Sequence, residues 1–228
     1  MITILLIFIF FISIMYMIKN KLIIRIDTFF RKGFEKHDDK FGIYCFDGKQ
    51  GDGKTYSVVD FLGETRKQEQ TIISNVKSFC ENNKEITIYE TDFYKIMKMC
   101  EENGYGKKYI IFFDEIFTLI EKGKLDKKVL SFLSQMRKRG LILVTTAQEW
   151  LEINVTFRRY VRYRIKCNMR NMPFFNCAIS TNIIEDAYQM KWDNLENEYV
   201  CPIIKTTIKK CGLKIANSYD TYETIGGL

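Results

Sequence analysis

The sequence contains a single histidine, His37, among 228 residues. Histidine-rich metal sites are therefore excluded, and a serine or cysteine triad would depend on one residue in a charged segment. The seven cysteines are odd in number and are never spaced C-x-x-C, so neither a disulfide framework nor a zinc site is indicated. Scattered cysteines of this kind are typical of reduced, cytosolic thiols. The sequence also lacks an N-K-x-D guanine-reading motif, which disfavours a GTP switch.

The length and the charge set broad limits on the protein's class. A chain of 228 residues is long enough for one domain with a sizeable core. Its formal net charge is +7, from 35 Lys and Arg against 28 Asp and Glu. This excess favours anionic partners, either nucleic acid or an acidic membrane face, although a solvated surface alone can also produce it.

An uncharged apolar run occupies residues 2–18, at the short end of the ~17 to 25 residues that cross a bilayer. No basic residue precedes the run and no small-residue cleavage site follows it, which disfavours a cleaved signal peptide. We expect a transmembrane anchor at 1–20 and a basic juxtamembrane connector at 21–40. Lys19, Lys21 and Arg25 then place the rest of the chain in the cytoplasm. A buried core helix or an interfacial helix is the alternative.

From residue 41 onward, predicted strands and helices alternate. We expect buried strands at 41–47, 71–76, 109–113 and 141–146, and helices at 54–67, from 91 or 92 to 104, and at 125–139. This alternation predicts an α/β fold, a mainly parallel central sheet flanked by helices, with ligands at the carboxyl ends of the strands. Segments at 160–167, 178–184 and 200–208 predict further strands, which could be antiparallel. We therefore expect one domain at 41–228, with a core at 41–159 and a β-rich extension at 160–228.

The phosphate-binding motif G-x-x-x-x-G-K-T (Walker A) stands between the first of these strands and the first helix. It is formed by Gly48, Lys49, Gln50, Gly51, Asp52, Gly53, Lys54 and Thr55. The glycines let the backbone curl so that its N–H groups face a triphosphate such as ATP. Lys54 is expected to reach the β and γ oxygens, and Thr55 to ligate Mg²⁺. A chance match is the alternative, and the strand, loop and helix order argues against it.

An acidic pair, Asp114-Glu115, ends the predicted strand at 109–113 and has the Walker B pattern. We expect Asp114 to hold the Mg²⁺ hydration shell beside the phosphate loop, and Glu115 to act as the general base. A strand and a helix lie between the two motifs in the sequence. This order is typical of P-loop enzymes with a catalytic glutamate and an additional central strand.

Gln148 lies two residues past the predicted strand at 141–146, where its amide is expected to contact the attacking water and the γ-phosphate. A polar residue that merely ends a strand is the alternative. An arginine finger for a neighbouring subunit is sought first at Arg137 and Arg139, and next at Arg158 and Arg159. Basic residues near helix ends are also common on solvated surfaces.

Aromatic and basic residues alternate at 160–164, and Phe174 and Phe175 follow. Such residues can stack with bases and contact phosphates of single-stranded nucleic acid, although ordinary sheet surface is the better explanation for most of them.

With these motifs laid out, the chain resembles the zonula occludens toxin (Zot) family. This family includes the filamentous-phage assembly ATPases, within the FtsK/HerA class of P-loop DNA-translocating motors. The resemblance rests on the phosphate loop, the strand ending in Asp114-Glu115, and the run 136–148, in which a basic segment, a glycine, a buried strand and a glutamine follow one another. Arg158 stands where the family tends to have an arginine, and 218–223 resembles a motif that closes the ATPase domain. The apolar segment precedes the ATPase domain here, whereas it follows that domain in the phage proteins.

The resemblance implies a membrane-anchored ATPase that couples ATP hydrolysis, with Mg²⁺, to translocation of viral DNA. Virion assembly by extrusion and genome packaging both fit this activity. The implied partners are further copies of the chain in a ring, viral DNA, coat or capsid proteins, and the host's cytoplasmic membrane. A non-hydrolysing nucleotide-binding membrane scaffold, and an ATPase for plasmid DNA or protein transport, are the alternatives.

Overall fold

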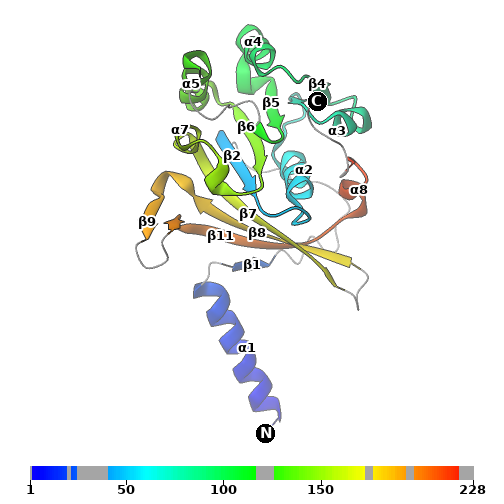
Figure 1. Ribbon diagram of the computed structural model, residues 1–228. Helices are drawn as coiled ribbons and strands as arrows, with labels where there is room; N and C mark the ends of the chain where they lie inside the picture. Colours follow the sequence, from blue (N-terminus) through cyan, green and yellow to red (C-terminus); the bar gives the residue numbers. More distant parts are fainter. Residues whose placement is uncertain are drawn as a thin grey trace.

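The computed structural model describes residues 2–19, 22–24, 41–116, 126–172, 177–193 and 198–220 (Figure 1). The strands in these ranges are β1 (Leu22–Ile24), β2 (Gly42–Asp47), β3 (Thr71–Ser74), β4 (Thr87–Tyr89), β5 (Tyr109–Phe113), β6 (Ile142–Ala147), β7 (Val161–Met172), β8 (Cys177–Asp186), β9 (Lys191–Asp193), β10 (Glu198–Val200) and β11 (Ile203–Lys210). The helices are α1 (Ile2–Lys19), α2 (Lys54–Thr65), α3 (Lys77–Asn82), α4 (Phe93–Asn103), α5 (Lys127–Ser134), α6 (Met136–Arg139), α7 (Val155–Arg158) and α8 (Leu213–Ala216), with 3₁₀ turns η2 (Tyr105–Lys107), η4 (Trp150–Glu152) and η6 (Ala187–Gln189).

Within these ranges, nine strands form one sheet in the order β1-β11-β8-β7-β2-β6-β5-β3-β4, and β9 and β10 form a separate antiparallel pair. The strands from β7 to β4 in this order are parallel neighbours of one another. Strands β2, β5 and β6 are buried along their whole length, as expected for parallel strands covered by helices on both faces. The predicted α/β fold with a mainly parallel central sheet is therefore confirmed.

Each face of the sheet has its own hydrophobic core. Alternate residues of β2 point to opposite faces, so Ile43 belongs to one core cluster and Tyr44 to the other. On the face of Ile43, Phe93 of α4 packs edge-on against Phe113, with ring centroids 5.6 Å apart. On the face of Tyr44, α2 and α3 cover the sheet. These two layers fix the position of α2, the helix that follows the phosphate loop.

The predicted helix ends in the core are largely confirmed. Asp92 caps α4 by accepting a hydrogen bond from the Tyr94 amide at 2.9 Å, and Gly104 ends the helix in the left-handed conformation. The predicted helix at 125–139 is instead two helices, α5 and α6, and its first residue lies outside the described residues. They are separate because the Gln135 amide bonds to Phe132, three residues back, which tightens the turn between them.

The expected β-rich extension at 160–228 continues the central sheet. Its first strand, β7, runs parallel to β2 and antiparallel to β8, so only the later pairings are antiparallel. The register of β7 against β2 shifts by one residue at Arg162, which marks a β-bulge. The stacking candidates Phe174 and Phe175, the end of the 218–223 motif, and most of the connector at 21–40 lie outside the described residues.

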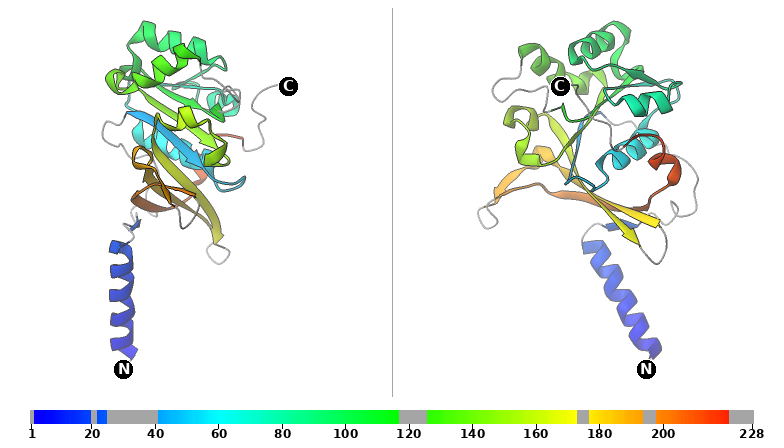
Figure 2. Two further views of the ribbon diagram at one scale, coloured as in Figure 1. Left: turned by 60° about the vertical axis from the view of Figure 1, so that its left-hand side comes forward. Right: turned by 45° about the vertical axis from the view of Figure 1, so that its right-hand side comes forward.

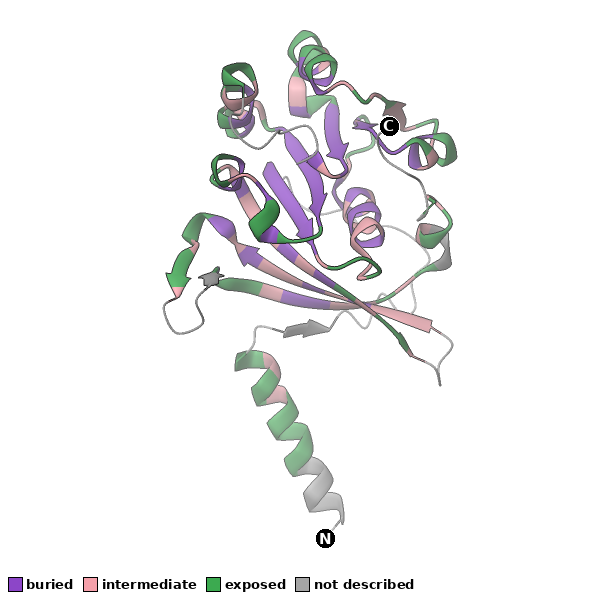
Figure 3. Cartoon of the chain, viewed as in Figure 1, coloured by how far each residue is buried: buried purple, intermediate pink, exposed green. Residues whose placement is uncertain are grey.

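Helix α1 extends away from the rest of the chain in both views of Figure 2. Most of its described side chains are exposed and apolar, including Phe8, Phe10 and Ile18 at 63%, 64% and 68% (Figure 3). By length and hydropathy, none of the helices in the described part of the chain qualifies as a membrane crossing. The predicted transmembrane anchor at 1–20 is therefore not confirmed.

Candidate functional site

The phosphate loop joins the carboxyl end of β2 to the first residue of α2. Gly51 and Gly53 have φ values of 90° and 74°, a region that side-chain-bearing residues rarely adopt. Gly53 is also crowded, since a Cβ atom there would lie 3.0 Å from the Cβ of Met169. The first helical hydrogen bond of α2 runs from the Ser57 amide to the Gly53 carbonyl at 2.9 Å. The predicted strand, loop and helix order is thus confirmed, with the loop curled at its glycines.

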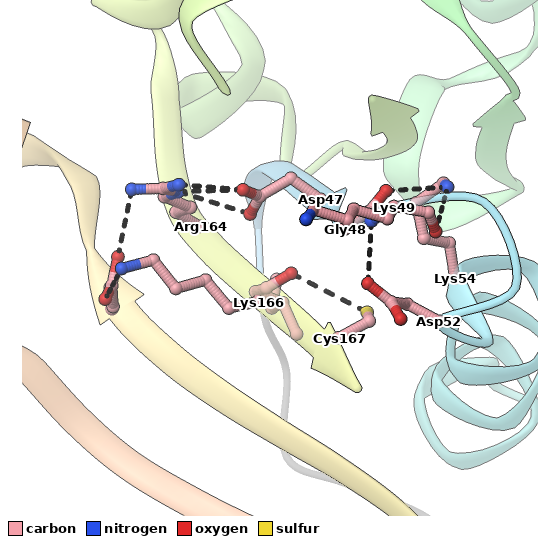
Figure 4. A network of polar contacts seen from close by, with 10 residues as sticks. Asp47, Gly48, Lys49, Asp52, Lys54, Arg164, Lys166 and Cys167 are labelled. Carbon is pink, nitrogen blue, oxygen red and sulfur yellow. Dashed lines mark hydrogen bonds and ion pairs between the residues drawn. The ribbon is translucent and has the colours of Figure 1, made fainter. Parts of the chain in front are cut away.

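Two polar side chains hold the loop in its curled form (Figure 4). The Lys54 ammonium donates to the carbonyl oxygens of Gly48 and Lys49, at 2.8 and 3.0 Å. The Asp52 carboxylate accepts a hydrogen bond of 2.7 Å from the Lys49 amide. The Lys54 side chain therefore lies along the inner side of the loop, where the motif requires a cation for phosphate oxygens.

The acidic pair follows β5 and is tied to both neighbouring strands. Asp114 is buried, and its carboxylate accepts a hydrogen bond from the Thr146 hydroxyl of β6. Asn75, just after β3, accepts a bond of 2.7 Å from the Asp114 amide and donates one of 3.0 Å to its carbonyl. The Glu115 amide donates to the Thr146 hydroxyl at 3.2 Å. These bonds fix the turn at the end of β5 from both sides.

The backbone of Glu115 has a φ of 49°, which is unusual for a residue other than glycine. Unfavourable backbone conformations of this kind persist where the surrounding structure enforces them, and they concentrate at functional sites. Here the Glu115 amide donates to the Thr146 hydroxyl, and the Ile116 amide donates to the Thr145 hydroxyl at 3.3 Å. Glu115 is thus directed by a rigid turn.

Burial raises the pKa of Asp114 to about 6. The Thr146 hydrogen bond opposes this rise by lowering the pKa, Glu115 adds to it by charge repulsion, and the positive charge of Lys54 lowers it again. Lys54 and Asp114 therefore interact electrostatically, although they come from different motifs. A carboxylate whose ionised form is penalised by burial would be stabilised by a nearby cation.

Mg²⁺ fits these residues. Asp114 supplies a buried carboxylate, and Thr55 supplies a hydroxyl in the first turn of α2. The described residues contain no group of three or more His, Cys, Asp or Glu that could hold a metal ion. A site with so few protein ligands is suited to Mg²⁺, which commonly keeps several waters and binds substrate phosphates. Thr55 and Asp114 remain the predicted protein ligands.

The two motifs are not on neighbouring strands. Strand β6 lies between β2 and β5, with Asp47 opposite Ala147 and Phe113 opposite Thr145. The expectation that the strand of the acidic pair is the direct neighbour of the strand before the phosphate loop is therefore wrong, because β6 separates the two. This order agrees with the predicted additional central strand. It also places exposed Gln148, which follows β6, between the two motifs at the same edge of the sheet.

The candidate finger arginines lie at the opposite end of the strands. Arg137 of α6 stacks over Phe41, which precedes β2, with 5.8 Å from the guanidinium carbon to the ring centroid. Arg139 is 4.1 Å from the Tyr105 ring and pairs with Glu101. Arg158 is buried, and exposed Arg159 precedes β7. Since β2 is six residues long, about 20 Å separate these arginines from the phosphate loop of their own chain.

A buried ion network lies at Asp47, the residue just before the phosphate loop, and the sequence did not indicate it (Figure 4). Arg164 of β7 donates three hydrogen bonds of 2.8 to 3.2 Å to the carboxylate of Asp47, the last residue of β2. Arg164 also pairs with Glu185 of β8, which pairs in turn with Lys166 at 2.9 Å. Strands β7 and β8 are thereby fastened to the residue that precedes Gly48.

Asn75, Thr145 and Thr146 were also missed from the sequence, although a signal was present. Each is a polar residue at the carboxyl end of a buried strand, which is the argument that identified Asp114. In contrast, no local pattern pairs Asp47 with Arg164, because they are 117 residues apart.

No protein-family model matches the chain, and no curated protein matches it. Among solved structures, it is similar to the N-terminal domain of zonular occludens toxin from Neisseria meningitidis, with 15% identity, a TM-score of 0.45, and coverage of 83% of this chain and 100% of that one. It is also similar to B204, the DNA-packaging ATPase from Sulfolobus turreted icosahedral virus, with 11% identity, a TM-score of 0.46, and coverage of 70% and 96%. The flagellar accessory protein FlaH from Methanocaldococcus jannaschii has 13% identity, a TM-score of 0.44, and coverage of 74% and 86%. The predicted resemblance to the Zot family is confirmed to this extent.

Proposed function

We propose that this chain is a Mg²⁺-dependent ATP hydrolase that uses the energy of hydrolysis to move viral DNA. The observation that carries the hydrolase is the position of Lys54 and Asp114. They belong to two separate motifs, lie at the same edge of the sheet, and interact electrostatically across β6. A lysine in a curled phosphate loop and a buried carboxylate form the two sides of a site for a metal-bound triphosphate.

The proposed roles follow from these positions. The loop amides and Lys54 bind the phosphates, and Thr55 and Asp114 hold Mg²⁺, which when bound would neutralise charge on the β and γ oxygens. Glu115, directed by its rigid turn, accepts the proton of the attacking water. Gln148, which follows β6, orients that water and contacts the γ-phosphate.

An arginine from another copy of the chain would complete the site, in a ring. Of the candidates, Arg137 and Arg159 are exposed, whereas Arg158 is buried and Arg139 is already stacked and paired. An arginine at the far end of the strands can serve only a neighbour's site. A hexamer, and coat or capsid proteins as further partners, belong to the same proposal.

The viral DNA cargo is supported by the order of motifs that the chain shares with the Zot family and by its net charge of +7. Hydrolysis in a motor of this kind should depend on the polymer. Single-stranded or double-stranded DNA is therefore expected to raise the rate of ATP turnover, whereas an unfolded protein should leave it unchanged. Stimulation by protein alone would favour the protein-transport alternative.

Attachment to the host's cytoplasmic membrane through α1 is the remaining part of the proposal. It is supported by the apolar, exposed side chains of α1 and by Lys19 at its end. Flotation of the full chain with phospholipid vesicles tests it. The full chain should float, and a chain that begins at residue 41 should stay at the bottom of the gradient. Equal flotation of both would remove α1 from the proposal.

The hydrolase itself is tested by Glu115→Gln, with Glu149→Gln as the matched control. Both are glutamates at the carboxyl edge of the sheet, but Glu149 is exposed, follows β6 and does not belong to the acidic pair. Glu115→Gln should lower kcat by about 10² to 10⁴ and leave ATP affinity nearly unchanged, whereas Glu149→Gln should have little effect on either. Lys54→Ala should abolish nucleotide binding. If Glu115→Gln binds and hydrolyses ATP like the natural chain, the non-hydrolysing scaffold is the better interpretation.

A further inference from the structure

The end of the sheet opposite the phosphate loop carries a row of basic residues. The row is formed by the segments that lead into five neighbouring parallel strands: 66–70 before β3, 105–108 before β5, 136–140 before β6, Phe41 before β2, and 159–162 at the start of β7. These segments contain one acidic residue, Glu69, and nine basic ones: Arg66, Lys67, Lys107, Lys108, Arg137, Lys138, Arg139, Arg159 and Arg162.

Direct contacts join these segments into one continuous edge. The Gln70 side chain donates to the Gly106 carbonyl, and Gly106 lies so close to Gly140 that an added Cβ would be 1.9 Å from its oxygen. The Gly42 amide donates to the Leu141 carbonyl at 2.8 Å, and Arg162 donates to the Phe41 carbonyl at 3.1 Å. Because neighbouring strands are ~4.8 Å apart, the five segments span roughly 20 Å along one line.

The row presents both charge and flat rings to solvent. Lys107, Lys108 and Lys138 are exposed. The Arg162 guanidinium stacks over the half-buried Phe41 ring at 4.2 Å, and Arg139 stacks over Tyr105 at 4.1 Å. Stacking holds these guanidinium groups in fixed planes. Because Arg162 also donates to the Phe41 carbonyl and Arg139 pairs with Glu101, the exposed lysines are the groups most available for phosphate oxygens.

The carboxyl end of the same sheet has the opposite balance. Directly after β4, β5 and β6, the described residues 90–92, 114–116 and 148–152 include no basic residue and six acidic ones, which are Glu90, Asp92, Asp114, Glu115, Glu149 and Glu152. Outside the phosphate loop, a long polyanion is therefore disfavoured at the nucleotide edge and attracted to the opposite one. Charges segregated in this way orient an approaching polyanion before any contact forms.

We propose that this basic row binds the sugar-phosphate backbone of nucleic acid. The inference rests on the proposed function, and it assigns the DNA of that proposal to a specific surface. A duplex carries one charge per about 1.7 Å of its axis, so a line of roughly 20 Å faces several phosphates at once. A narrow row with stacked guanidinium groups suits a linear backbone better than the flat surface of a membrane. Contacts to phosphates would make the binding independent of base sequence.

The test is the triple variant K107S/K108S/K138S, with K77S/K95S/K98S as the control of equal charge. The control lysines are exposed and lie on α3 and α4. DNA affinity is measured by fluorescence anisotropy of a labelled 20-base-pair duplex at several salt concentrations. If each removed lysine contacts one phosphate, affinity at 0.1 M salt falls about 8-fold per lysine, and the salt slope falls by about 0.9 each. The control variant should bind within about 2-fold of the natural chain.

The outcomes separate this inference from the proposed function. Suppose that DNA binds to the natural chain and raises its ATP turnover, and that the row variant binds DNA equally well. The basic row is then not the DNA-binding surface, but the proposed motor is not contradicted. If the natural chain does not bind DNA at all, both the row and the DNA cargo are wrong. If the row variant lost binding to anionic phosphatidylglycerol vesicles but kept its DNA binding, the row would be a membrane contact and the inference would be wrong.

ATP turnover without DNA should be equal in the natural chain, the row variant and the control variant, which shows that the row variant is folded. Lys138→Glu alone should weaken DNA binding further than Lys138→Ser.

Discussion

Replacing Asp114 with Asn should change how the stability of the protein depends on pH. Burial raises the pKa of Asp114 from 3.8 to about 6 in the folded chain, while in the unfolded chain it titrates near its ordinary value. Between these two pH values the folded state holds a proton that the unfolded state has released. The free energy of unfolding therefore falls as the pH rises through this window and is constant above it. Asn cannot ionise, so the variant lacks this contribution.

The size of the effect follows from the same values. One pKa unit corresponds to about 1.4 kcal/mol, so a rise from 3.8 to about 6 costs the folded state about 3 kcal/mol at neutral pH. Between pH 4.5 and pH 7.5, the stability of the natural chain relative to Asp114→Asn should fall by about 2 kcal/mol. Thr146→Val removes a hydroxyl that favours the ionised form, so it should raise the pKa of Asp114 further and enlarge this fall.

Urea unfolding at a series of pH values, without nucleotide and without Mg²⁺, measures these differences. The reasoning is wrong if the natural chain and Asp114→Asn lose stability in parallel across the window. It is also wrong if Thr146→Val makes the difference smaller. Mg²⁺ with a nucleotide should remove most of the difference in the natural chain, because a bound cation stabilises the ionised carboxylate.

Two further predictions concern the framework of the site. Arg164→Met should destabilise the fold by about 3 to 5 kcal/mol, because the buried carboxylates of Asp47 and Glu185 lose their shared guanidinium. In urea unfolding, the double variant D47N/R164M should recover part of this loss. If the single and the double variant were equally stable, the network would not have the proposed role. Gly106→Ala should cost about 1 to 3 kcal/mol in thermal or urea unfolding, since its Cβ would meet the Gly140 backbone, whereas Gly212→Ala, with open space around it, should be nearly neutral; similar values for the two would contradict the close approach.

The sequence predicted the phosphate-binding half of the site well because its signals are local. The motif, its flanking strand and helix, and the capping Asp92 and Gly104 are each recognised within a few residues along the chain. The position of Asp114 at a strand end followed from a continuous apolar run. These features depend on backbone conformation and burial, which short stretches of sequence determine.

The remaining parts depend on strand order, which local patterns do not contain. The sequence placed the acidic pair beside the phosphate loop, but β6 separates them, because strand neighbours in space are not neighbours in the chain. The candidate arginines were chosen for their place near the ends of predicted elements. In the structure they lie at the amino end of the sheet, because α6 and α7 each lead into a parallel strand that begins there.

The β-rich segment after residue 160 holds the phosphate-loop helix in place along its length. Ser57 of α2 donates a hydrogen bond of 3.0 Å to Asn182 of β8, and Lys209 of β11 pairs with Asp60 and Glu64 of α2 at 2.7 and 2.6 Å. Arg164 holds the other side of the loop through Asp47. A change in the loop that shifts α2 must therefore either move β7, β8 and β11 with it or break buried ion pairs. Because breaking them leaves buried charges without partners, concerted movement is the less costly response. In the proposed motor, β7 would connect the nucleotide site to the proposed DNA-binding row, since Arg162 of the row and Arg164 lie two residues apart on this strand.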